Sequence, residues 1–213
     1  MGTFSQTVVK RYNDLSKEDC CLSCGKALSF ANVQAGETCV DLGSGQGHDV
    51  LRMAILAGDS GFSYGIDISE GMIETARNNA SKLQLKNVSF IRSPLESLTL
   101  ENNITDVVIS NCTINHSLDQ AKVWREIARI LKPGGRFVVS DIYALEQVPD
   151  EFASDPKAVS ECWAGAVVKD MYIKHILDAG MEHLEMLEES LPYEKGKIRV
   201  ASFTISGQKI SNK

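Results

Sequence analysis

Short apolar runs alternate with longer amphipathic segments along most of this chain. From Glu37 onward, each apolar run is followed by a stretch whose apolar positions recur with the period of a helix. This alternation is typical of a parallel sheet whose strands are connected by helices that cover both faces. The sequence therefore predicts an α/β fold with a Rossmann-like, doubly wound and mostly parallel sheet of seven strands.

The apolar runs and amphipathic segments give the expected bounds of each element. Strands are expected at 38–42, 62–66, 88–91, 106–110, 136–141, 183–187 and 199–206. Helices are expected at 48–56, 70–83, 120–131 and 170–179. Ser69 is a suitable N-cap for the second of these helices. Pro133-Gly134-Gly135 predicts the end of the third, because proline cannot continue a helix.

The first 30 or so residues precede the first predicted strand. They are free to form a helical cover over the carboxyl ends of the strands, where ligands bind in this architecture. We therefore expect an N-terminal cover segment at 1–30, followed by one domain at 31–213. A single core agrees with a length of 213 residues.

The charge of the chain limits its partners. A formal net charge of -6 leaves no basic stripe, so phosphate backbones and anionic membrane surfaces are repelled on average. No apolar run approaches the roughly 20 residues that span a bilayer, and the first residues lack the apolar core of a secretory signal. We expect a cytoplasmic protein that binds neither nucleic acid nor membrane. The sequence does not indicate an oligomeric state.

A glycine-rich turn follows the first predicted strand. Val40-Asp41-Leu42 leads directly into Gly43-Ser44-Gly45-Gln46-Gly47, and a helix is predicted from His48. Glycine allows a tight turn and a close approach to a ligand where a Cβ would intrude. Asp67 ends the second strand, about 20 residues past the turn, where a carboxylate can accept hydrogen bonds from both ribose hydroxyls. The spacing favours a nucleotide cofactor, although it fits a dinucleotide pyrophosphate poorly.

These residues resemble the first motifs of class I S-adenosylmethionine-dependent methyltransferases. Leu131-Lys132-Pro133-Gly134-Gly135 is a second match, and the resemblance extends over most of the chain. It implies that the cofactor is S-adenosyl-L-methionine. It also implies that Asp41 and the turn hold the methionine end, Asp67 the ribose and Met72 the adenine. The expected cofactor-binding residues are Asp41, Gly43, Ser44, Gly45, Gly47, Asp49, Asp67, Ile68, Met72, Leu95, Glu96 and Asn111.

Two of these assignments have an alternative, and in one segment the sequence differs from the family pattern. Asp49 is a candidate for the methionine ammonium, but it can equally serve as a helix-dipole partner. Met72 can belong to the ordinary core. The segment Arg92-Ser93-Pro94-Leu95-Glu96 lacks the acidic residue that many relatives place near the adenine amine. Backbone groups around Leu95, with Glu96, are expected to take its place.

Six cysteines are distributed along the chain, and three segments that contain them resemble arsenite methyltransferases. The segments are Cys20-Cys21-Leu22-Ser23-Cys24-Gly25, Ser110-Asn111-Cys112-Thr113-Ile114-Asn115 and Glu161-Cys162-Trp163-Ala164-Gly165-Ala166. In that family one cysteine of each segment is associated with trivalent arsenic, which implies Cys24, Cys112 and Cys162 as catalytic residues and arsenic ligands. Soft thiolates suit a soft, three-coordinate metalloid. Arsenic so held keeps a lone pair, so positioning toward the sulfonium methyl replaces a general base.

The remaining cysteines and a histidine have other readings. Cys39 lies inside the first predicted strand and is expected to be a small buried hydrophobe, a reading that also competes for Cys112 and Cys162. Cys20 and Cys21 are candidates for substrate transfer, for a redox pair or for replacing Cys24. A zinc site is disfavoured because a second C-x-x-C pair is absent from the sequence. His116 is either a general base or a solvent-facing loop residue.

We therefore expect methyl transfer to arsenite or methylarsenite, as in arsenic detoxification, with a metalloid or small-molecule substrate and a thiol reductant as partners. The alternative is an O- or C-methyltransferase of a small metabolite, whose mark would be a general base such as His116. A third possibility is a binding protein without turnover. Many arsenite methyltransferases carry a further C-terminal domain. We expect a short form without it, which leaves selenium, tellurium or organoarsenical substrates open.

Overall fold

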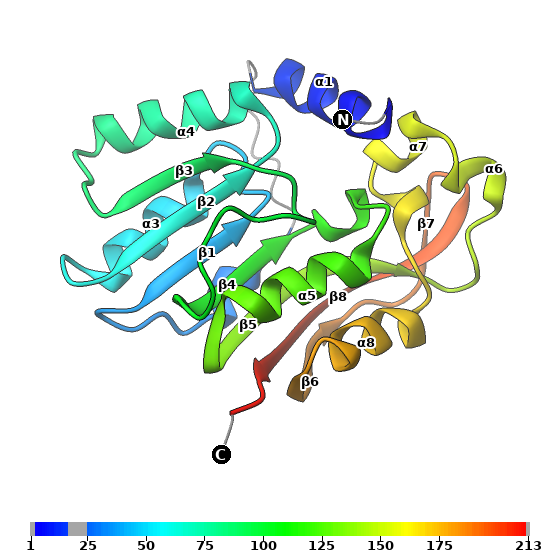
Figure 1. Ribbon diagram of the computed structural model, residues 1–213. Helices are drawn as coiled ribbons and strands as arrows, with labels where there is room; N and C mark the ends of the chain where they lie inside the picture. Colours follow the sequence, from blue (N-terminus) through cyan, green and yellow to red (C-terminus); the bar gives the residue numbers. More distant parts are fainter. Residues whose placement is uncertain (1–2, 17–24, 212–213) are drawn as a thin grey trace.

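The computed structural model describes residues 3–16 and 25–211, with side chains from Gln6 onward. Within these residues eight strands form one sheet in the order β3-β2-β1-β4-β5-β8-β6, and β7 pairs with β8 (Figure 1). The strands are β1 Thr38–Leu42, β2 Phe62–Asp67, β3 Val88–Arg92, β4 Thr105–Asn111, β5 Leu131–Ala144, β6 Met181–Glu189, β7 Tyr193–Lys195 and β8 Ile198–Lys209. Strands β1 to β5 run parallel, and β8 is antiparallel to β5, β6 and β7. The predicted mostly parallel sheet is confirmed, with eight strands rather than seven.

The four predicted helices correspond to α3, α4, α5 and α8, and further short helices surround them. The helices are α1 Thr3–Leu15, α2 Ala27–Phe30, α3 His48–Ala57, α4 Glu70–Lys82, α5 Gln120–Ile130, α6 Asp150–Ala153, α7 Pro156–Ser160 and α8 Lys169–Asp178. Two 3₁₀ helices, η1 Ile114–His116 and η2 Trp163–Gly165, complete the set. The Ser69 hydroxyl accepts the Met72 N–H at 3.2 Å, which confirms the predicted cap of α4. Helix α5 ends directly before Leu131-Lys132-Pro133.

Side chains that alternate along β1 divide the core between the two faces of the sheet. Val40 and Leu42 pack with Trp124 of α5, whereas Cys39 packs with Met53 of α3 on the other side. Successive strand residues point to opposite faces, so a central strand needs cover on both. The predicted helices on both faces are therefore confirmed.

Helix α1 lies over the end of the sheet at which the parallel strands finish (Figure 1). The Asn13 side-chain oxygen accepts the Ser69 hydroxyl at 2.6 Å and the Gly71 N–H at 3.1 Å. The helix is thus tied to the first turn of α4, in the position that the sequence left open for a cover. None of the described helices is long and apolar enough to cross a membrane.

Candidate active site

A cavity of about 510 Å³ lies at the carboxyl ends of the strands, under α1. Its lining comes from the turn after β1, from the segments after β2, β3 and β4, and from the segment around Cys162. All but two of the residues expected to bind the cofactor line it: Asp41, Gly43, Ser44, Gly45, Asp49, Asp67, Ile68, Leu95, Glu96 and Asn111. The two exceptions are Gly47 and Met72.

The exceptions have packing roles. Gly47 precedes α3 with a φ of 84°, and a Cβ there would lie 2.8 Å from the ring of Phe90. Met72 is completely buried in α4. Gly47 is therefore required by the contact between the turn and β3. The position of Met72 agrees with the alternative expectation of a core residue, and its contact with the adenine stays a prediction.

The glycine turn is shaped by its neighbours as well as by its own backbone. Gly43 has a φ of 73°, and a Cβ there would lie 2.1 Å from the Thr113 hydroxyl oxygen. Gly45 donates its N–H to Asp67 Oδ2 at 2.9 Å, and a Cβ on it would meet nothing within 4 Å among the described residues. The Gly45 backbone is therefore fixed by Asp67, while the space next to its Cα stays open.

The carboxyl groups of Asp41, Asp49 and Asp67 face this cavity, and Arg52 Nη1 lies 3.7 Å from Asp49 Oδ1. Burial, and then the charges of Asp49 and Asp67, raise the pKa of Asp41 well above its usual range. Burial also raises the pKa of Asp49, and it raises the pKa of Asp67 against hydrogen bonds from Ser69 and Gly45. Close carboxylates in a poorly solvated site favour a positively charged ligand. The cavity thus combines a glycine turn with carboxyl groups that favour a cationic ligand.

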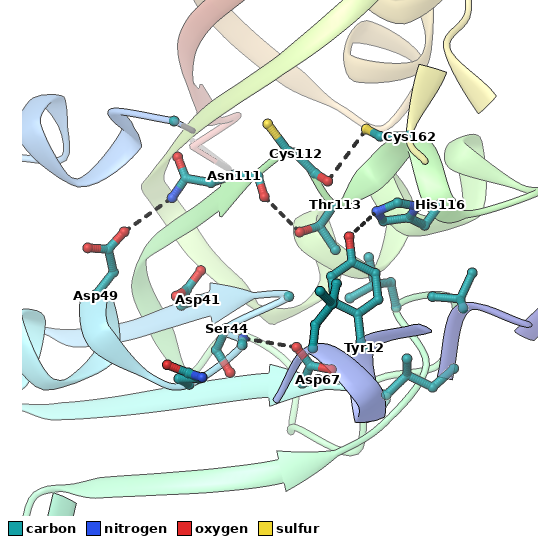
Figure 2. A pocket seen from close by; sticks show the side chains of 18 of the residues that line it. Tyr12, Asp41, Ser44, Asp49, Asp67, Asn111, Cys112, Thr113, His116 and Cys162 are labelled. Atoms are coloured by element: carbon teal, nitrogen blue, oxygen red, sulfur yellow. Dashed lines mark hydrogen bonds between the residues drawn. The ribbon is translucent and has the colours of Figure 1, made fainter. Parts of the chain in front are cut away.

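Cys112 and Cys162 lie on the opposite wall of the same cavity from Asp41 and Asp67 (Figure 2). Cys112 follows β4 with a φ of 51°, and Cys162 precedes η2 with a φ of 76°, a backbone region that residues other than glycine seldom adopt. Cys162 Sγ lies 3.6 Å from the Cys112 carbonyl oxygen and 3.8 Å from Asp141 Oδ1. Burial, followed by the charges of Asp141 and Cys112, raises the pKa of the Cys162 thiol. The structure brings two of the three expected arsenic ligands together.

The other cysteines are separate from this pair. Cys39 is completely buried in β1, and burial raises its pKa to about 12, which confirms its expected role as a small core residue. Cys24, Cys20 and Cys21 lie outside the described residues. Gly25, which follows Cys24 in the chain, lines the cavity.

His116 lines the cavity with both ring nitrogens engaged by the protein. Its Nδ1 lies 3.0 Å from the Val159 carbonyl oxygen, which can only accept, so Nδ1 carries the hydrogen. Its Nε2 therefore accepts the Tyr12 hydroxyl at 2.9 Å. Burial lowers the pKa of His116 to about 4. The expectation of a solvent-facing histidine is wrong, and no lone pair of the ring is left free for a general base.

The sequence did not indicate Tyr12, Lys195 or Asp141 as neighbours of the cysteines. Tyr12 comes from α1, and Lys195 comes from the short strand β7 and lines the cavity. Asp141 lies in β5 and is completely buried, and this burial raises its pKa to about 7. No motif marks these residues, because each reaches the site through contacts with segments distant in sequence.

The Asn111 side chain connects α3 with α2. Its amide nitrogen donates to Asp49 Oδ2 at 3.2 Å, and its Oδ1 accepts the Ala27 N–H at 3.2 Å.

Comparisons with known proteins agree with this architecture. A family model described as a methyltransferase domain matches residues 34–196. An arsenite methyltransferase of Halobacterium salinarum is 36% identical over 165 residues, which are 78% of this chain and 42% of the relative. The chain thus spans about two fifths of that relative's length. A 27-O-demethylrifamycin SV methyltransferase of Amycolatopsis mediterranei is 32% identical over 154 residues, 70% of this chain and 56% of the relative.

Solved structures include an arsenic(III) S-adenosylmethionine methyltransferase from Chlamydomonas reinhardtii. It is 30% identical, with a TM-score of 0.79, and the alignment covers 95% of this chain and 74% of that structure.

Proposed function

This chain belongs to the S-adenosylmethionine-dependent methyltransferases, and from that membership we propose that its acceptor is trivalent arsenic held by cysteine thiolates. One observation carries the proposal. Cys112 and Cys162, fifty residues apart in sequence, line the same cavity as the glycine turn and Asp67, and Cys162 Sγ lies 3.6 Å from the Cys112 carbonyl oxygen. The similarity to arsenite methyltransferases supports the same acceptor.

The described residues fit the cofactor of this family. S-adenosylmethionine, when bound, supplies a methyl group on a positively charged sulfur, and it also carries an ammonium group. Asp41 and Asp49 are proposed to hold the ammonium group, which would offset the burial that raises both pKa values and the charge of Asp49 that further raises the pKa of Asp41. Asp67 is proposed to accept the ribose hydroxyls, and Leu95 and Glu96 to line the adenine end. The Ser117 hydroxyl donates to Glu96 and fixes its carboxylate.

Binding of the cofactor is expected to weaken as the pH falls. The pKa values of Asp41, Asp49 and Asp67 are raised in the free protein, so these carboxyls become neutral at a higher pH than ordinary ones. A cationic ligand prefers the ionised carboxylates, so binding at mildly acidic pH should release protons. Calorimetry in two buffers of different ionisation enthalpy measures that release. Affinity that stays constant with pH, without proton release, would count against these carboxyls as the ammonium site.

In the half of the cavity that would bind the acceptor, the main task of the protein is to position arsenic. Cys112 and Cys162, with Cys24 as the proposed third ligand, would hold arsenic with its lone pair directed at the methyl group. Holding both reactants in line supplies much of the acceleration. The arsenic lone pair would form the new As–C bond as the C–S bond breaks, and the electron pair of the C–S bond would leave with the sulfur. Arsenic is then formally pentavalent, so a thiol reductant is the proposed partner that restores the trivalent state.

A small-metabolite methyltransferase is the second candidate, favoured by the likeness to the rifamycin-modifying relative. The engaged nitrogens of His116 argue against it, since deprotonation of an oxygen or carbon acceptor needs a free base. Incubation with methyl-labelled S-adenosylmethionine and arsenite, methylarsenite or small organic acceptors separates the two. Label on arsenic supports the proposal. Label only on an organic acceptor selects the second candidate, and cofactor binding without transfer selects a binding protein.

A further inference from the structure

A buried chain of side-chain amides lies behind the two cysteines. Asn115 stands in η1, three residues after Cys112, and is completely buried. Its Nδ2 donates to Asp141 Oδ1 at 2.9 Å and to the Ile142 carbonyl at 2.8 Å. Its Oδ1 accepts Gln120 Nε2 at 3.0 Å. The amide of Asn115 therefore joins the segment after β4 to the end of β5 and the start of α5.

The same chain reaches the Cys162 segment. Gln120 Nε2 also donates to the Gly165 carbonyl at 2.7 Å. The Gly165 backbone packs so closely that a Cβ would lie 1.8 Å from the Asn115 carbonyl oxygen. Asp141 Oδ1, which Asn115 holds, lies 3.8 Å from Cys162 Sγ. The loops that carry the two thiols are thus fixed to each other through Asn115 and Gln120.

Asn115 and Gln120 are outside the lining of the cavity beside the cysteines, as far as the described residues define it. Their effect on a ligand must therefore pass through other groups. Both cysteines have a positive φ, and such a backbone conformation persists in a residue other than glycine only where the surroundings hold it. The hydrogen-bonded chain supplies those surroundings on the side away from the cavity.

We propose that Asn115 and Gln120 are positioning residues that set the Cys112 and Cys162 thiols for joint capture of one trivalent arsenic atom. This inference rests on the proposed role of the two cysteines. When two thiolates of one protein bind one arsenic atom, the second As–S bond forms intramolecularly. The gain in affinity from this second bond depends on how well the second thiol is placed. Removing the amide chain should weaken two-point capture and leave each single thiol reactive.

Phenylarsine oxide is a suitable probe, because it needs two thiols and no cofactor. Two As–S bonds form, and the arsenic-bound oxygen leaves as water with both thiol protons, without a change of oxidation state. Binding would be measured in the full chain with Cys20, Cys21 and Cys24 replaced by Ser, so that Cys112 and Cys162 are the accessible pair. Asn115→Leu removes the amide of Asn115. Gln120→Met removes the amide of Gln120 at similar side-chain length, and the Oε1 lost with it has no hydrogen-bond partner among the described residues. Alkylation by N-ethylmaleimide reports single-thiol reactivity in the same proteins.

Both variants are expected to lose at least about tenfold in affinity for phenylarsine oxide, with unchanged alkylation rates. Thr105→Val is the matched control: its hydroxyl is completely buried and donates to the Thr38 carbonyl at 2.9 Å and the Val107 carbonyl at 3.0 Å, at the other end of β4. It should lower stability without changing the affinity.

Three results would overturn the inference. The first is full affinity in folded Gln120→Met, which decides the matter if Asn115→Leu does not fold. The second is an equal loss of affinity in Thr105→Val. The third is failure of the parent protein to bind phenylarsine oxide, which alone would also remove the arsenic site itself.

Discussion

Replacing either Cys112 or Cys162 by Ser is expected to reduce arsenite methylation to nearly nothing. Each replacement removes a soft thiolate and leaves a hydroxyl that binds the metalloid poorly. Serine is close to cysteine in volume, and neither residue belongs to the glycine turn, so the fold and cofactor affinity should survive. Product analysis and calorimetry on the same preparations measure the two properties separately.

Cys39→Ser is the control, with the opposite expected result. Cys39 is completely buried in β1, so a hydroxyl there should lower stability while activity per folded molecule persists. Methylarsenite already carries one carbon in place of an exchangeable ligand, so it should tolerate the loss of one cysteine better than arsenite. Near wild-type arsenite methylation by both Cys112→Ser and Cys162→Ser would refute the arsenic site and favour the small-metabolite candidate.

Replacing Asp67 by Ala is expected to weaken cofactor binding by about 1–3 kcal/mol, the usual cost of losing a charged hydrogen-bond acceptor. Asp67 also holds the turn, since its two oxygens accept the Gly45 N–H at 2.9 Å and the Ser69 N–H at 2.8 Å. The change should therefore disturb both the proposed ribose contact and the backbone of the glycine turn. Calorimetric titration with S-adenosylmethionine measures the loss.

Two further variants separate these contributions. Asp67→Asn keeps an oxygen for one backbone N–H but removes the charge, so its loss should be smaller than that of Asp67→Ala. Ser63 lies in the same strand, is completely buried, and is not part of the cavity lining. Ser63→Ala should leave the affinity unchanged. Unchanged affinity in Asp67→Ala would remove Asp67 from the cofactor site.

Long elements with a clear apolar period were predictable from the sequence. The strand expected at 38–42 is β1, and the other predicted strands lie within the observed ones. The short strand β7 carried no such signal, because its three residues are ordered by pairing with β8. Gly196 beside it packs on the ring of Trp163, a contact between segments far apart in sequence. Such elements depend on tertiary contacts rather than on local preference.

The candidate site also has a part that the sequence predicted and a part that it did not. The glycine turn and Cys112 each directly follow a strand, and Asp67 ends one, so these motifs and their position in the sheet could be inferred together. The environment of His116 could not, because Tyr12 reaches it across 104 residues and Val159 across 43. Met72 lies in the first turn of α4, where it is completely buried and does not line the cavity, and periodicity alone does not distinguish this position from a ligand-facing one.

The most direct test of arsenic bound by these thiolates is X-ray absorption at the arsenic edge of the arsenite-loaded protein. Cysteine ligation predicts a first shell of sulfur in the wild-type protein. It also predicts that Cys112→Ser and Cys162→Ser each lose one sulfur from that shell, whereas Cys39→Ser loses none. A shell of oxygen alone, or a sulfur shell that stays the same in both site variants, would contradict the proposal that this cavity holds arsenic for methylation.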